Sequence, residues 1–249
     1  MVTIRCANVT FRNIEAIVFD KDGTLENSWD ELRTLAINCA RRIDAQVPGI
    51  GDPLLMAFGV LENQLDPQGL MAVGSRQENL IAAAAYIAET GRPWPECLKI
   101  ARAAFDQASD TPQRDESASP VFPGAIAVLQ QLHAAGLKLA ILSAATDAEV
   151  KNFVAAHQLQ DQVAVALGLT DDGLFKPDPA LFQKVCNQLQ IAPDRVLMVG
   201  DSGHDWQMAR GAGAAGVIGI RWGNASLVPA KAVDAAIADL QELQVVTAQ

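Results

Sequence analysis

The chain of 249 residues lacks long apolar runs and paired cysteines. No apolar run approaches the roughly 20 residues that a membrane-spanning helix needs, and the N-terminus lacks the basic-then-apolar order of a secretory signal. The cysteines form no CxxC pair, which argues against a clustered zinc site and against a disulfide framework. We therefore expect a cytoplasmic protein without a membrane partner, in which the thiols of Cys6, Cys39, Cys97 and Cys186 are reduced.

Positive charge is also in short supply. The chain has 19 Lys and Arg against 29 Asp and Glu, a net charge of −10, which disfavours a nucleic-acid-binding surface. Half of the residues are apolar and 19% are charged, so a sizeable core can be buried and disorder is not expected. The length allows one large domain or two modest ones.

Short apolar runs predict the strands of a parallel sheet, because runs of this length are typical of strands that are buried on both faces. Segments with helical periodicity lie between most of them; in residues 125–135, Ile126, Leu129 and Leu132 share one face. Strands that alternate with helices predict an α/β fold, a Rossmann-like, doubly wound parallel sheet that binds ligands at the carboxyl ends of its strands. The runs are residues 16–19, 137–142, 163–167, 196–199 and 217–220, and further helices are expected at 179–189 and 202–212.

A long segment after the first strand has no convincing strand pattern. We interpret residues 26–118 as an inserted, all-helical cap domain, and residues 1–25 and 119–249 as the α/β core domain. Glycines and prolines separate the expected helices, and the polar residues 109–120 form the return linker. Residues 3–10 are expected to add an edge strand. The helices of the insert are expected at 29–45, 53–61, 76–90 and 95–108.

Two aspartates follow directly on the first predicted strand, as Asp20 and Asp22 in the string Phe-Asp-Lys-Asp-Gly-Thr. Carboxylates on alternate residues of a straight strand would face opposite ways, but Gly23 indicates that the chain turns here. Both acids can then reach one pocket. Two acids at a strand end are costly unless a cation or a reaction uses them, so a functional site is favoured over a solvated turn.

A second buried run, 196–199, is also followed by acids. Asp201 stands at the strand end and Asp205 in the first turn of the next helix, where it could simply complement the helix dipole. Two strands that each end in a carboxylate pair are better explained by a shared hard cation. Mg²⁺ prefers oxygen ligands and keeps several waters, so we expect it as the cofactor.

Two weaker signals lie between these acids. Ser143 ends a predicted strand, where its hydroxyl and the next amides could hold a phosphate, although such a serine is often a helix N-cap. Lys176 lies in a turn-rich segment, where a lysine is usually solvated. Because the net charge is −10, an anionic substrate needs local positive charge, which Lys176 and a metal would supply.

A glycine pattern near the C-terminus is a decoy. Residues 211–216 spell GxGxxG, but a predicted helix precedes them and a strand follows, the reverse of a dinucleotide-binding fingerprint. We expect no nucleotide cofactor there.

In order and spacing, these residues resemble the haloacid dehalogenase-like hydrolase superfamily. Its four motifs match Asp20 to Thr24, Ser143, Lys176, and Gly200 to Asp205, and an insert after the first motif resembles the cap called C1. The pattern is most similar to phosphoglycolate-phosphatase-type members, including residues 168–172 ahead of the lysine.

The resemblance implies a role for each matched residue. Asp20 would be the nucleophile that becomes an aspartyl-phosphate, and Asp22 the acid and base. Lys176 is implied as a third catalytic residue that also binds the phosphoryl group. The implied metal ligands are Asp20, Asp201, Asp205 and the Asp22 carbonyl, and the other implied phosphate-binding residues are Ser143, Ala144, Gly23 and Thr24.

The resemblance leaves more than one function open. Dehalogenases of the superfamily have no aspartate at the second position, so Asp22 favours phosphate-ester cleavage or phosphoryl transfer. We expect hydrolysis of a small phosphorylated metabolite. Ala144 departs from the asparagine common in the family, which removes a side-chain contact but keeps the amide. A sugar phosphomutase of the same superfamily is an alternative, and a phospho-accepting signalling module is another, although that module explains neither Asp22 nor the cap. No pattern identifies the ester, the cap residues that select it or the oligomeric state.

Overall fold

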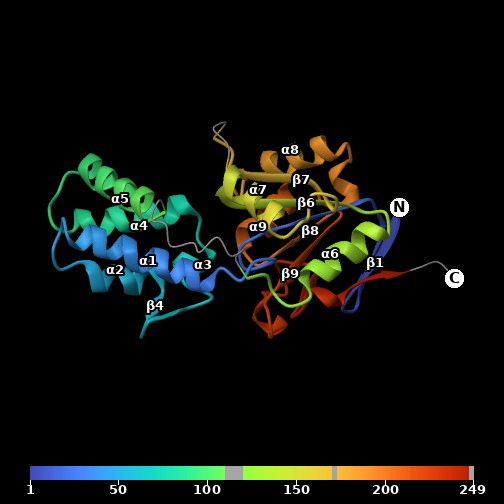
Figure 1. Cartoon of the computed structure of the whole chain (residues 1–249), viewed down its shortest axis with the longest axis horizontal. Helices are drawn as coiled ribbons and strands as arrows, with labels where there is room; N and C mark the ends of the chain where they lie inside the picture. Colours follow the sequence, from blue (N-terminus) through green and yellow to red (C-terminus); the bar gives the residue numbers. More distant parts are fainter. Residues whose placement is uncertain (110–119, 170–172, 247–249) are drawn as a thin grey trace. The chain divides into compact units, whose positions relative to one another are not determined.

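The computed structural model describes residues 1–109, 120–169 and 173–246. The chain divides into two compact units (Figure 1), Met1–Asn27 with Ala118–Gln249, the core unit, and Ser28–Ser117, the helical unit. Most of the expected return linker, residues 110–119, lies outside the described residues, as do residues 170–172 of the segment ahead of Lys176.

A six-stranded sheet of parallel strands forms the centre of the core unit, which confirms the predicted doubly wound α/β fold. Its order is β10-β9-β8-β3-β6-β7, so the first strand of this sheet in the chain, β3, lies in the middle and the order reverses beside it. Ligands of such sheets bind at this switch point. The strands are β3 (Ala16–Phe19), β6 (Lys138–Thr146), β7 (Val163–Leu169), β8 (Val196–Gly200), β9 (Gly216–Ile220) and β10 (Ala235–Ile237).

Apolar residues on both faces of β3 explain the layers. Ala16 and Val18 belong to one buried cluster, and Ile17 and Phe19 belong to the other, because side chains alternate along a strand. Helices α8 and α9 complete the first cluster, whereas α6 and α7 contribute to the second. These helices are α6 (Ala125–Ala134), α7 (Asp147–Ala156), α8 (Pro179–Leu189) and α9 (Gly203–Gly211).

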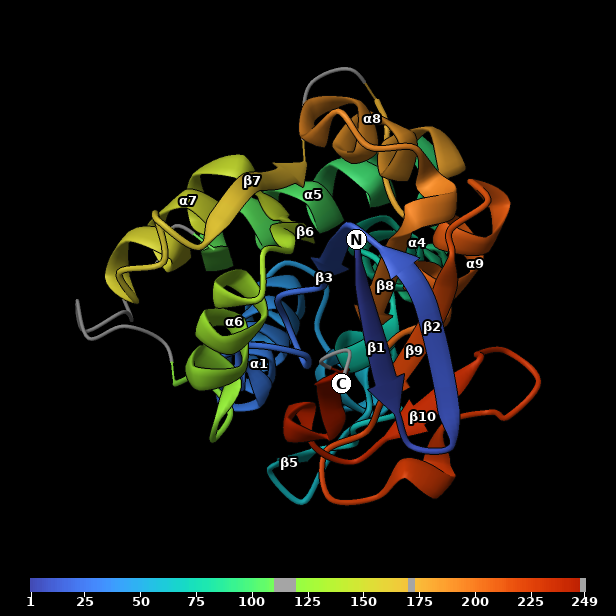
Figure 2. The ribbon, with the colours of Figure 1, turned by 90° about the vertical axis from the view of Figure 1, so that its right-hand side faces the viewer.

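The prediction of one edge strand at residues 3–10 is wrong. The segment forms the hairpin of β1 (Val2–Cys6) and β2 (Val9–Ile14), which pairs with β11 (Leu243–Val246) in a separate antiparallel sheet (Figure 2). Only one face of this hairpin is apolar, as Ile4, Cys6, Phe11 and Ile14 are buried. Ile4 and Cys6 alternate along β1, whereas Phe11 and Ile14 of β2 are three residues apart because Asn13, at φ 59°, adds a residue to that strand. A single apolar face suits an antiparallel sheet that covers a core rather than a strand buried on both faces.

The helical unit has its own apolar core and one short hairpin that the all-helical prediction lacked. Strands β4 (Val60–Leu61) and β5 (Gln64–Leu65) pair across Glu62 and Asn63, whose φ values of 48° and 62° are those of a tight hairpin turn. The helices are α1 (Trp29–Asp44), α2 (Gly51–Phe58), α3 (Leu70–Val73), α4 (Arg76–Ala88) and α5 (Trp94–Ser109). Single turns of 3-10 helix lie at Pro193–Arg195, Ala225–Leu227 and Leu240–Glu242.

No helix in the described ranges is both long enough and apolar enough to cross a bilayer.

The cysteine thiols are buried and free, which leads to a testable expectation. Burial raises the pKa of Cys6, Cys39 and Cys186 to about 12 each, so almost no thiolate forms at pH near 8. We expect the native protein to react with a thiol-specific disulfide reagent far more slowly than the urea-unfolded chain, in which all four thiols react. Rapid labelling of the native protein, followed by its absorbance, would contradict this burial.

Candidate active site

Three neighbouring strands deliver polar side chains to one edge of the sheet. Asp20 follows β3, Asp201 follows β8, and Ser143 lies near the carboxyl end of β6. The register aligns Phe19 with Val199, and the Asp20 amide donates to the Val199 carbonyl at 2.9 Å. Carboxyl ends of parallel strands meet at one edge, so residues more than 100 positions apart in the chain become neighbours.

Three buried carboxylates face one another at this edge. One oxygen from each of Asp20, Asp201 and Asp205 lies within 4.8 Å of the other two. Asp205 also takes part in the capping box of α9, because its Oδ2 accepts from the Ser202 amide at 3.2 Å and from the Ser202 hydroxyl at 2.6 Å. The helix-start role and the site role are therefore both present in one side chain, the cap using Oδ2 and the site Oδ1.

Burial and mutual repulsion disfavour three ionised carboxylates in this cluster. Burial raises the pKa of Asp20, and the neighbouring carboxylates raise it further, against the lowering effect of Lys176. Burial and the charge of Asp205 raise the pKa of Asp201 to about 7, although Arg221 and Lys176 oppose this. Buried like charges that destabilise one another are typical of functional sites rather than of structural ion pairs.

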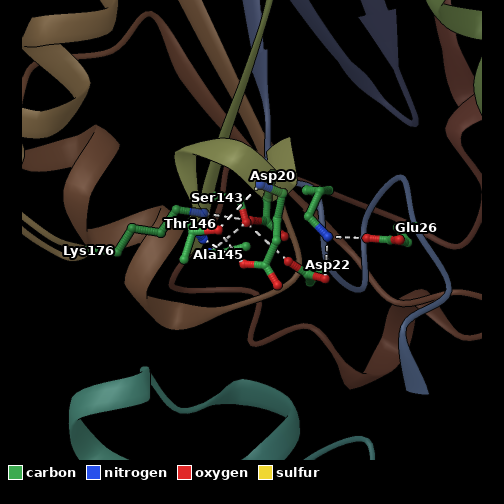
Figure 3. A network of polar contacts seen from close by, with 9 residues as sticks. Asp20, Asp22, Glu26, Ser143, Ala145, Thr146 and Lys176 are labelled. Atoms are coloured by element: carbon green, nitrogen blue, oxygen red, sulfur yellow. Dashed lines mark hydrogen bonds and ion pairs between the residues drawn. The ribbon is translucent and has the colours of Figure 1, made fainter. Parts of the chain in front are cut away.

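Lys176 supplies one cation to the cluster. Its Nζ lies 2.5 Å from Asp20 Oδ1 and 2.6 Å from Asp205 Oδ1, and the side chain is buried (Figure 3). Burial would lower the pKa of Lys176, but the two carboxylates outweigh it and the pKa is raised, so the lysine is charged. Lys176 is thus part of the site and not a solvated turn residue.

Asp22 is held apart from the three carboxylates. Its Oδ1 accepts from Lys21 Nζ at 2.7 Å and its Oδ2 from the Ser143 hydroxyl at 3.0 Å. Burial would raise the pKa of Asp22, but Lys21 lowers it more by its charge and hydrogen bond, so the group is a carboxylate. The two aspartates of the first motif thus have different environments, which is how acid and base roles are separated.

Ser143 is not a helix N-cap, because β6 continues past it to Thr146, which caps α7. The Ser143 hydroxyl accepts from the Ala145 amide at 2.9 Å, and Ala144 is exposed beside it.

Gly23 and Thr24 stabilise the turn after β3. Gly23 has φ +77°, and a Cβ there would lie 2.5 Å from Asp201 Oδ2, so only glycine lets the chain pass this carboxylate. Its amide already donates to the Glu26 carbonyl at 2.9 Å. Thr24 is fully buried. Both residues therefore shape the turn, and neither the Gly23 amide nor the Thr24 hydroxyl faces solvent.

Three charged residues at the site were not predicted from the sequence. Arg221 donates to Asp201 Oδ2 at 3.1 Å, and Lys21 and Glu26 form a buried ion pair beside Asp22. Arg221 follows β9 directly, so it carries the same signal as Asp20 and Asp201, a charged residue at the end of a buried strand. Lys21 and Glu26 lie within the turn itself, where the sequence signals a turn but not a buried pair.

The chemistry of the donor set fits a divalent metal ion. Three buried carboxylates whose oxygens lie this close together are a donor set of the kind that a hard cation such as Mg²⁺ prefers, and such a cation would relieve the repulsion that raises the pKa of Asp20 and of Asp201. The Asp22 side chain lies outside this set.

Comparisons with known proteins agree with this geometry. The family model for haloacid dehalogenase-like hydrolases matches residues 14–213. The chain is 30% identical over 209 residues to a phosphoglycolate phosphatase of Vibrio vulnificus, covering 83% of this chain and 84% of that protein. It is 29% identical over 210 residues to one of Rhodospirillum rubrum, covering 82% and 78%.

A solved structure shares the fold. A predicted phosphoglycolate phosphatase from Haemophilus somnus 129pt superposes with a TM-score of 0.63 at 23% identity, covering 88% of this chain and 91% of that one. The family match spans β3, Ser143, Lys176 and the Asp201–Asp205 segment, and so includes the three carboxylates and the lysine of the site. This chain belongs to the haloacid dehalogenase-like hydrolase family.

Proposed function

We propose that this chain, a phosphatase, hydrolyses a small phosphomonoester through an aspartyl-phosphate on Asp20 and requires Mg²⁺. The observation that carries the proposal is the convergence of Asp20, Asp201 and Asp205 around Lys176, with Asp22 held separately by other partners. This arrangement offers a nucleophile, a cation site and a separate proton carrier at one sheet edge.

In the first half-reaction, an Asp20 carboxylate oxygen attacks phosphorus. The bond from phosphorus to the ester oxygen breaks as the new bond to Asp20 forms, and the leaving oxygen takes a proton from Asp22. Lys176 already contacts Asp20 Oδ1 at 2.5 Å, which leaves the other oxygen of Asp20 for the attack. The Asp22 carboxylate must gain a proton before this step, which the approach of an anionic phosphate next to it favours.

In the second half-reaction, water attacks the phosphorus of the aspartyl-phosphate. Asp22, now a carboxylate, accepts a proton from the water, and the Asp20–phosphorus bond breaks to release phosphate and the free Asp20 carboxylate. Lys176 and Ser143 would bind phosphoryl oxygens as negative charge develops. Mg²⁺ bound by Asp20, Asp201 and Asp205 would neutralise charge on the phosphoryl group.

Substrate and compartment belong to the same proposal. The relatives are named phosphoglycolate phosphatases, so phosphoglycolate is the first substrate to test. The helical unit is proposed as the cap that selects the ester. Four free, buried cysteines support the cytoplasm as the compartment.

The proposal predicts that phosphate release from phosphoglycolate or an aryl phosphate needs Mg²⁺ and stops with EDTA. Assays of the purified chain measure released phosphate with and without the ion. Product analysis with a hexose phosphate separates release from transfer, since a mutase would return the phosphoryl group to the sugar. A chain that turns over no ester in the presence of Mg²⁺ would refute the proposed function.

Metal binding has an independent readout in thermal unfolding. Mg²⁺ at about 100 times its dissociation constant should stabilise the wild type by about 2.7 kcal/mol, and Asp201→Asn should lose most of this stabilisation because one of three ligands is gone. An Asp234→Asn variant, which changes an aspartate of a half-exposed ion pair with Arg210, is the matched control and should keep the shift. Equal shifts in wild type and Asp201→Asn would contradict the assigned metal site.

A further inference from the structure

We propose that Lys21 and Glu26 act as a buried pair that positions Asp22, holding Asp22 Oδ1 so that Oδ2 is the oxygen that transfers the proton. The inference rests on the proposed function, because Asp22 is the proton carrier there. It assigns a task to two residues that neither the metal site nor the phosphoryl contacts use.

The first support is the burial of charge. The side chains of Lys21 and Glu26 are each 3% exposed, and Lys21 Nζ contacts both Glu26 Oε2 and Asp22 Oδ1, the latter at 2.7 Å. Lysine and glutamate are rarely buried so completely. A buried ion pair gains little stability over apolar residues of the same size, so stability alone does not account for it. The contact of Lys21 with Asp22 gives the buried pair a task, which is to hold the Asp22 carboxylate in place.

The second support is the backbone that links the pair. The Lys21 carbonyl accepts from the amides of Leu25 and Glu26, both at 2.9 Å, and Asp22 and Glu26 form a β-bridge. The backbone hydrogen bonds of the turn alone therefore place Glu26 beside Lys21. On its other side, Lys21 Nζ lies 5.7 Å from the ring centre of Phe153 in α7, a cation–π contact. The ammonium group is thus fixed by three neighbours.

The third support is that the two buried lysines of the site have different carboxylate partners. Lys176 contacts Asp20 and Asp205 but not the Lys21 pair, whereas Lys21 contacts Asp22 and Glu26. In Figure 3, Glu26 lies on the opposite side of Asp22 from Lys176. Asp22 Oδ1 accepts from a buried ammonium group. Asp22 Oδ2 accepts from the hydroxyl of Ser143, which can rotate away.

The experiment replaces the pair by apolar residues of similar size, Lys21→Met with Glu26→Leu, which removes both buried charges together and is expected to preserve folding. The probes are phenyl phosphate, whose leaving oxygen needs a proton, and dinitrophenyl phosphate, whose leaving group does not. We expect kcat/KM to fall about 10- to 100-fold on phenyl phosphate and by less than about 3-fold on dinitrophenyl phosphate. A purely structural role would lower both rates equally.

Lys151→Met is the matched control, since it removes a lysine whose ion pair with Asp147 is exposed on the same helix as Phe153, and both rates should stay at the wild-type level. Glu26→Gln keeps the shape of the pair. Its kcat/KM should also fall more on phenyl phosphate than on dinitrophenyl phosphate, but by a smaller factor than in the double variant. Equal losses on the two esters, or none, in the folded variants would overturn the inference. An inactive wild type would instead refute the proposed function itself.

Discussion

Replacing Asp20 with asparagine is expected to lower phosphatase turnover by about 10⁴-fold or more while the fold remains intact. The amide cannot form the aspartyl-phosphate, because it lacks the nucleophilic oxygen. Asparagine has nearly the same shape, and its carbonyl can still accept from Lys176, which donates to Asp20 at 2.5 Å. The measurement is phosphate release at saturating Mg²⁺, with circular dichroism as the test of folding.

Although Asp20→Asn is expected to lose activity, it is expected to gain stability. Without a metal ion, Asp20 repels Asp201 and Asp205 in a buried cluster, so removing its charge should not lower the melting temperature in EDTA and is expected to raise it. Asp30→Asn, at an exposed position in the helical unit, is the matched control for activity and should keep the wild-type rate. Full turnover by Asp20→Asn would exclude Asp20 as the nucleophile.

The largest loss of stability is expected at Lys176. Lys176→Met leaves Asp20 and Asp205 buried without the cation that lies 2.5 and 2.6 Å from them, which should cost about 3 to 5 kcal/mol. Urea unfolding in EDTA measures this loss. Turnover should fall as well, because the phosphoryl group loses its lysine contact.

The same substitution at an exposed lysine shows how much of the stability loss comes from burial of the ion pair rather than from loss of a positive charge. Lys151→Met breaks an ion pair with Asp147 at 2.6 Å, but the side chain of Lys151 is 65% exposed and that of Asp147 33%, and the expected change is below about 1 kcal/mol. Mg²⁺ should restore part of the stability lost in Lys176→Met, since it offers the same carboxylates another cation. A Lys176→Met protein as stable as the Lys151→Met control would show that the cluster does not depend on this lysine.

The two lysines near the first motif explain why one short string can serve two chemical roles. Asp20 lies among carboxylates that oppose its charge, and its pKa is raised by burial and by their repulsion. Asp22 lies two residues away, and its pKa is lowered because Lys21 and Ser143 outweigh the effect of burial. The turn at Gly23 separates the environments, so neighbours in sequence face different partners.

Much of this protein could be predicted from local pattern alone. Apolar runs placed β3, β6, β7, β8 and β9, because strands buried on both faces need consecutive apolar residues. The acids after β3 and β8 were recognised because charge at the end of a buried strand is expensive without a use. Strand ends meet at one edge of a parallel sheet, so their convergence followed from topology.

Other features were decided only by contacts between distant parts of the chain. The pairing of β1 with β11 joins the two ends of the described chain, and no local periodicity encodes that choice. Arg221 reaches Asp201 only because β9 lies beside β8. Lys21 meets Phe153 of α7, more than 100 residues away, only because the fold packs α7 against the turn after β3. Local sequence determines where a strand and its acids occur, whereas the partner of each charge is set by packing between elements, since burial and distance exist only in the folded chain.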